Sequence, residues 1–94
     1  MRVEWNRTAL DDRTAIIDYL IVRNPYVAEA LLLRLIEAAD ALADFPLLAR
    51  VGEDGTRELV TVPPYVLVYE VDEASETVRI LRVWHAAQDR TGRR

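Results

Sequence analysis

Hydrophobic residues recur every three or four positions in the first half of the chain, and they alternate or run together in the second half. The clearest helical pattern begins at Asn24-Pro25, a cap and first-position pair, and continues to about residue 44. About 20 residues at 1.5 Å each make a rod of roughly 30 Å, long enough to cross a small sheet. Phe45-Pro46 ends this helix. Its predicted apolar face consists of Ala28, Leu31, Leu32, Leu35, Ile36, Ala39 and Leu42.

A shorter helix is predicted before it, ending near Arg23. Asn6 or Thr8 can cap its N-terminus. Asp11 and Asp12 are expected in the first turn, where their charges complement the helix dipole. The buried stripe of this helix is expected to comprise Leu10, Ile17, Leu20 and Ile21.

Strand patterns occur at four places, one before the helices and three after them, namely residues 2–5, 56–62, 65–71 and 77–84. The acidic turn at residues 72–75 makes the last two an antiparallel hairpin. Pro63 and Pro64 cannot donate ladder hydrogen bonds and belong in the preceding connection. The segment 47–55 is predicted to be a loop that turns back at Glu53-Asp54-Gly55.

The order strand, two helices, three strands predicts an α+β fold. It consists of an N-terminal strand, a two-helix hairpin and a three-stranded antiparallel meander, with the helices packed on one face of the sheet. We expect an antiparallel sheet of four strands whose other face stays partly open for a ligand or partner. A single domain spans residues 1–90 and residues 91–94 form a polar tail.

The amino-acid composition excludes several kinds of site and several classes of protein. Without cysteine there is neither a disulfide framework nor a thiolate zinc site, and one histidine gives no support for a metal. No cofactor is implied. No apolar run approaches the roughly 20 residues of a membrane span, and the N-terminus does not have the pattern of a signal peptide. We therefore expect a cytoplasmic protein without a membrane partner.

The charge balance bears on the kind of partner. All 12 basic residues are arginines, and 16 acidic residues bring the net charge to −4. General affinity for a polyanion requires many neutralised phosphates, so this balance argues against it. A local arginine cluster could still bind RNA. Arginine also suits paired contacts with a carboxylate-rich protein.

The end of the last predicted strand holds the clearest chemical candidates. His85, the only histidine, offers an imidazole as a proton-transfer group, although a structural strand-end histidine is the alternative. Arg82 and Trp84 share one strand face, opposite Leu81 and Val83. Stacked on the open face, this pair could contact a base or a partner side chain. The alternative for Trp84 is a position at the edge of the core.

The sequence resembles the RelE/ParE superfamily of bacterial toxins over almost its whole length. The matching features are an early strand ending in Trp5, Asn24-Pro25 between the helices, Phe45-Pro46, the segments 55–59 and 68–72, and the closing segment 82–89. The resemblance implies a toxin of a type II toxin–antitoxin module, of the kind associated with plasmid stabilisation. It also implies a hetero-oligomeric complex in which a cognate antitoxin, encoded beside the toxin, neutralises it.

The superfamily divides by target. RelE-like members are implied to be ribosome-dependent mRNA endonucleases. On that reading His85 transfers a proton, while Arg57 and Arg82 stabilise charge. ParE-like members are implied to inhibit DNA gyrase without nuclease chemistry. Under either hypothesis, the resemblance and the open sheet face indicate five candidates for binding the target or the antitoxin. They are Arg50, Tyr65, Trp84, Gln88 and Asp89.

Individual positions favour the ParE-like reading. Many RelE-like sequences place an arginine where this chain has Val66, after the aromatic that begins the middle strand. A second proton-transfer group is not evident unless Glu58 or Asp89 reaches the site, and loss of such a group costs about 10²–10⁴-fold in rate. Arg57 can equally be a solvated charge and Tyr65 a packing residue. We therefore predict a gyrase inhibitor, with an mRNA endonuclease or an inactive interaction module as alternatives.

Overall fold

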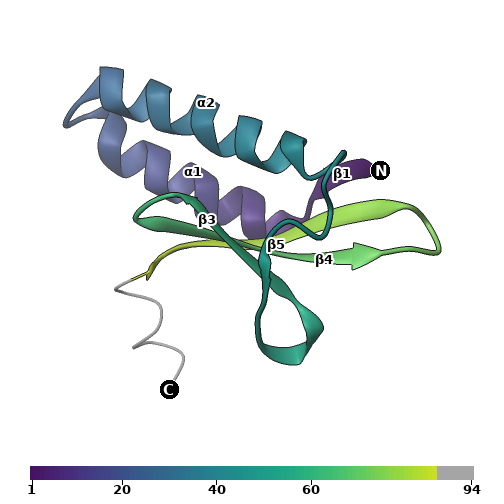
Figure 1. The fold of residues 1–94 in the computed structure, drawn as a ribbon. Helices are drawn as coiled ribbons and strands as arrows, with labels where there is room; N and C mark the ends of the chain where they lie inside the picture. Colours follow the sequence, from purple (N-terminus) through teal and green to yellow (C-terminus); the bar gives the residue numbers. More distant parts are fainter. Residues whose placement is uncertain (87–94) are drawn as a thin grey trace.

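The computed structural model describes residues 1–86 and shows two helices packed on one face of a five-stranded sheet (Figure 1). In chain order the elements are β1 (Arg2–Trp5), α1 (Arg7–Ile21), α2 (Pro25–Ala41), β2 (Arg50–Val51), the short 3₁₀ turn η1 (Glu53–Gly55), β3 (Arg57–Val62), β4 (Tyr65–Asp72) and β5 (Thr77–His85). The predicted α+β order of a strand, a helical hairpin and an antiparallel meander is confirmed.

The sheet differs from the expected all-antiparallel arrangement. Its strand order is β1-β5-β4-β3-β2, and β1 lies parallel to β5, whereas the other neighbours are antiparallel. Parallel pairing needs a long connection between the two strands. The helices and the rest of the sheet provide it, because they lie between the first and last strands in the sequence.

A fifth strand, β2, was not predicted, since residues 47–55 were expected to be a loop. The chain does turn back at the predicted place, where Asp54 and Gly55 adopt φ angles of 58° and 77°. The Gly52 amide donates to the Thr56 carbonyl oxygen at 2.6 Å and closes this turn. The closure brings the two residues of β2 into register with the start of β3. β2 is therefore a short edge strand produced by the turn.

Both helices begin as predicted. The Asn6 side chain accepts a hydrogen bond from the Ala9 amide at 2.8 Å, and Asn24 does the same for the Val27 amide at 3.2 Å. Pro25 occupies the first position of α2. α1 and α2 end two and three residues earlier than expected, which is the usual uncertainty of helix ends.

The prediction that Asp11 and Asp12 lie in the first turn of α1 is wrong. Because Asn6 is the cap, the first turn is formed by residues 7–9 and contains no acidic side chain. The two aspartates lie one turn later. Asp11 pairs loosely with Arg7 at 3.9 Å, whereas Asp12 turns toward the sheet.

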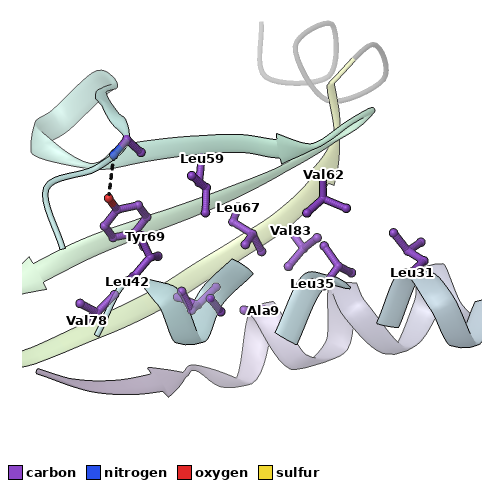
Figure 2. Packing of buried hydrophobic residues seen from close by; sticks show 13 residues of the cluster. Ala9, Leu31, Leu35, Leu42, Leu59, Val62, Leu67, Tyr69, Val78 and Val83 are labelled. Carbon is purple, nitrogen blue, oxygen red and sulfur yellow. Dashed lines mark hydrogen bonds between the residues drawn. The ribbon is translucent and has the colours of Figure 1, made fainter. Parts of the chain in front are cut away.

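The core lies between the two helices and the sheet (Figure 2). The expected buried stripe of α1 included Leu10, but Leu10 is only half-buried and its neighbour Ala9 is fully buried instead. Ile21, also expected in the stripe, is 49% exposed at the end of the helix. A small side chain is found at the buried position because it lets the helix approach the strands closely. The cluster comprises Ala9, Leu31, Leu35, Ala39, Leu42, Ala49, Leu59, Val62, Leu67, Tyr69, Val78, Ile80 and Val83.

A β-bulge in β5 decides which side chains face the helices. Val68 is paired with Arg82 and the next residue of β4, Tyr69, is paired with Ile80, so Leu81 is the extra residue. Simple alternation from Ile80 would direct Arg82 into the core. The bulge reverses the alternation, so that Val83 is buried in the core instead.

Candidate target-binding face

The sheet face turned away from the helices follows from register and burial. Leu67 and Val83 are paired across β4 and β5 and belong to the core, so the pairs beside them point the other way. We call this surface the open face. From β1 to β2 it comprises Arg2, Glu4, Arg79, Arg82, Trp84, Val66, Val68, Glu70, Asp72, Glu58 and Arg50.

One half of the open face carries an aromatic and two valines. Val66 and Val68 are buried, with exposed fractions of 2% and 7%, although they lie outside the core cluster. Trp84 is paired with Val66, and the Arg82 guanidinium carbon lies 5.4 Å from the centroid of its ring. Arg82 and Trp84 therefore share a face, as predicted.

Asp12 of α1 holds the position of Arg82. Its Oδ2 accepts a hydrogen bond from Arg82 Nε at 2.8 Å and another from the Val83 amide at 2.9 Å. Its Oδ1 lies 3.4 Å from Arg82 Nη2. The carboxylate is thus bound by donors from two successive residues of β5.

The other half of the open face is an ion-pair network centred on Arg79. Its Nη1 lies 2.7 Å from Glu70, and Glu4 and Asp72 each approach the guanidinium to 3.9 Å. The hydrogen bond with Glu70 raises the pKa of Arg79. The hydrogen bond from the Ser75 amide, aided by its hydroxyl, lowers the pKa of Asp72. Arg79 therefore stays charged and engaged with acidic neighbours.

Every arginine of the open face contacts a carboxylate. The pairs are Arg2–Glu4 at 3.1 Å, Arg79–Glu70 at 2.7 Å, Arg50–Glu58 at 3.2 Å and Arg82–Asp12 at 2.8 Å. With Asp72, the face itself carries four carboxylates and four guanidinium groups, and Asp12 adds a carboxylate from α1. A surface with this balance does not concentrate a polyanion.

Arg57, a catalytic candidate, contacts the loop that leads into the sheet. Its Nη1 donates to the Ala49 carbonyl oxygen at 2.8 Å. The neighbouring Tyr69 is fully buried and donates to the Pro46 carbonyl oxygen at 2.8 Å. Its hydroxyl also accepts from the Ala49 amide at 3.3 Å, the bond drawn as a dashed line in Figure 2. These bonds satisfy the loop backbone, which gives Arg57 a structural role.

Tyr69→Phe is expected to lower the free energy of unfolding by about 1 kcal/mol, because the Pro46 carbonyl and Ala49 amide lose a buried partner. Burial raises the pKa of Tyr69 above its ordinary value of 10.0. Tyrosine in the unfolded chain therefore ionises first, and this stabilising contribution, complete below about pH 10, is lost as pH rises further. Denaturant unfolding from about pH 8 to about pH 11 should show a steeper loss in the wild type than in Tyr69→Phe. Parallel losses would contradict this.

His85 lies on the helix side of the sheet. It is paired with Tyr65 in β4, and the two rings meet edge to face with centroids 5.5 Å apart at an interplanar angle of 81°. Tyr65 packs against the core cluster. Three positions separate His85 from Arg82 in β5, so their side chains leave opposite faces of the strand.

The structure therefore does not bring the three catalytic candidates together. Arg82 is on the open face, His85 is at the strand end on the opposite face, and Arg57 binds the loop before β2. Of the binding candidates, Arg50 and Trp84 lie on the open face, whereas Tyr65 does not. The other two, Gln88 and Asp89, lie outside the described residues.

Asp12 is the residue of this face that sequence analysis missed. The sequence does contain a signal for it. Asp12 follows the buried Ala9 by three positions and precedes the half-buried Ile16 by four, so it lies on the apolar stripe of α1. A carboxylate on such a stripe indicates a polar partner on the packed element.

Within residues 1–86, no group of three or more histidine, cysteine or acidic side chains is arranged to hold a metal ion. None of the described helices is long and apolar enough to cross a membrane.

The fold corresponds to a known class, the RelE/ParE-type toxins of type II toxin–antitoxin systems. Residues 3–90 match the family described as "ParE toxin of type II toxin-antitoxin system, parDE". The chain belongs to this family.

Two named toxins are similar to this chain over most of their length. Toxin RelE2 of Caulobacter vibrioides is 46% identical over 87 residues, covering 93% of this chain and 97% of the relative. The putative toxin Y4kP of Sinorhizobium fredii is 37% identical over 89 residues, covering 93% and 90%.

Two solved complexes contain chains of the same fold. A chain of the chromosomal ParDE toxin–antitoxin system from P. aeruginosa superposes with a TM-score of 0.77 at 26% identity, covering 90% of this chain and 95% of that one. A chain of the toxin–antitoxin complex RelBE2 from Mycobacterium tuberculosis gives a TM-score of 0.67 at 27% identity, covering 89% and 95%.

Proposed function

We propose that this toxin inhibits DNA gyrase through protein–protein contacts of the open face and cleaves no RNA. The supporting observation is the charge of that face. Each arginine on the described part of this face contacts a carboxylate, so its positive charges are balanced by acidic neighbours. A nuclease acting on ribosome-bound mRNA needs cations directed at the phosphate that gains charge in the transition state.

The separation of the candidate catalytic groups supports the same proposal. General acid–base catalysis needs proton-transfer groups within hydrogen-bond reach of the reacting atoms. His85 and Arg82 leave opposite faces of β5, and Arg57 is bound to the loop backbone. The face is better suited to recognising a folded protein, for which an aromatic beside an arginine is a frequent anchor.

We also propose that a cognate antitoxin neutralises the toxin in a hetero-oligomeric complex, since the two similar structures come from a ParDE toxin–antitoxin system and a RelBE2 toxin–antitoxin complex. Apolar side chains exposed on the helices offer a second contact area. Tyr26 and Val22, at the tip of the helical hairpin, are 84% and 78% exposed, and Tyr19 and Leu33 are further exposed apolar side chains of the two helices. Exposed apolar patches of this kind are typical of protein contact sites.

The mRNA endonuclease remains the second candidate, because the 46% identical relative carries the name RelE2. The two candidates differ in what they require of His85. In an endonuclease, its replacement by alanine removes a proton-transfer group. In a binding inhibitor, the replacement removes an edge-to-face contact with Tyr65 on the other side of the sheet.

His85→Ala is therefore expected to leave growth inhibition in vivo within about threefold of the wild type, because the changed side chain leaves the open face intact. Inducible expression without antitoxin, titrated against colony formation, measures the effect. Equal protein levels and an unchanged melting temperature provide the control. A loss of about 10²-fold or more in a folded variant would favour the endonuclease. Harmless expression of folded wild-type protein would support the inactive module.

A further inference from the structure

The partner strand of β5 ends halfway along it. β1 is paired with β5 only as far as Trp5 opposite Ile80, and the Asn6 amide donating to the Ile80 carbonyl oxygen at 3.0 Å completes this ladder. Beyond that point the Val83 amide points toward the position that a longer β1 would have occupied. Asp12 occupies it instead and accepts that hydrogen bond at 2.9 Å.

The same carboxylate determines where Arg82 lies. Arg82 donates from Nε at 2.8 Å, so its guanidinium is held at the strand edge, 5.4 Å from the Trp84 ring centroid. The Asp12 side chain is only 18% exposed, whereas that of Arg82 is 43% exposed. The mostly buried Asp12 carboxylate thus holds the more accessible Arg82 guanidinium. Ordering an arginine before binding reduces the entropy lost when a partner binds it.

We propose that Asp12 is a positioning residue of the target-binding face, which orders the Arg82–Trp84 pair so that it can bind the toxin's protein target. This inference rests on the proposed function only in that Arg82 contacts the target. Asp12 itself acts through Arg82, because its carboxylate is turned to β5 and is mostly covered.

The decisive substitution is Asp12→Asn, with Asp11→Asn as the matched control. Asparagine has almost the same shape and retains an oxygen that can accept the Val83 bond, but it loses the charge that holds the guanidinium. Asp11 is the preceding residue of the same helix, 69% exposed and paired only with Arg7 at 3.9 Å. Because both changes remove one negative charge from α1, general electrostatic effects cancel in the comparison.

Growth inhibition in vivo is the readout, because it does not depend on which target is correct. Asp12→Asn is expected to weaken inhibition by about tenfold, whereas Asp11→Asn stays within about twofold. In an Arg82→Ala background, adding Asp12→Asn is expected to weaken growth inhibition no further, because the guanidinium that Asp12 orders is already missing. Additive losses in the double variant, or full toxicity of Asp12→Asn, would overturn the proposal.

A spectroscopic measurement separates positioning from a loss of stability. In proton–nitrogen NMR spectra, the Arg82 Nε–H is expected to be resolved and protected in the wild type. In Asp12→Asn, the chemical shift of this signal should move toward those of the exposed arginines, while the backbone amide signals of the core keep their chemical shifts. General loss of the amide dispersion would mean that Asp12 acts on stability alone, which contradicts positioning. Failure of the wild type to inhibit gyrase would leave the Asp12 result standing and would refute only the proposed target.

Discussion

Leu35→Ala is expected to lower the free energy of unfolding by about 2–5 kcal/mol. Leu35 is fully buried where α2 packs on the sheet, close to Val83 and the other core side chains drawn in Figure 2. Truncation removes apolar contacts and leaves a cavity that the surrounding helix and strands can fill only in part. Since small domains are stable by only about 5–15 kcal/mol, this change is a large fraction of the total. Denaturant unfolding at equilibrium measures it.

The control for this substitution lies two residues away on the same helix. Leu33 is 55% exposed and is not part of the core cluster. Leu33→Ala makes the same chemical change with the same gain in helix propensity, and it is expected to alter stability by about 0.5 kcal/mol or less. Similar losses for the two variants would mean that α2 does not pack through the face seen here.

Local sequence signals were sufficient to predict the helical half of the fold. Asn6 and Asn24 cap the two helices because a short polar side chain before an apolar periodic run can accept a free helix amide. The apolar face of α2 was predicted from its spacing, and Leu31, Leu35 and Leu42 are buried as expected. Signals of this kind lie within a few residues of the feature that they specify.

The arrangement of the sheet could not be obtained in this way. The parallel pairing of β1 with β5 joins segments more than seventy residues apart, and no local pattern encodes it. The bulge at Leu81 depends on how β4 and β5 pair, yet it determines that Arg82 faces away from the core. β2 forms only because the turn that follows it brings its two residues into pairing with β3.

The candidate site shows the same division. Parity within one strand correctly grouped Arg82 with Trp84. The helical spacing of Asp12 could have indicated a polar partner for it, but not that this partner is the β5 edge. The contact of Arg57 with the Ala49 carbonyl oxygen depends on the fold and has no local signal. Counting charges along the chain predicted no general affinity for a polyanion, but only the structure shows that each described arginine of the open face contacts a carboxylate.

The toxin is expected to inhibit DNA gyrase and to leave RNA uncut, because the arginines of the open face are paired with carboxylates. Within residues 1–86, the open face presents Trp84 and Arg82 to a partner without a cluster of unopposed cations, and His85 lies on the other side of β5. Such a surface can bind a folded protein through an aromatic and arginine anchor. Among the described residues, no acid and base are placed together with the directed positive charge that cleavage of an RNA backbone requires.

The most direct test is to compare both activities of the purified, antitoxin-free protein in the same preparation. One arm measures ATP-dependent supercoiling of relaxed plasmid by DNA gyrase, and the other follows intact mRNA on programmed ribosomes. The account predicts that the protein blocks supercoiling at a concentration that leaves the mRNA uncut. Cleavage of the mRNA with supercoiling unaffected would contradict it.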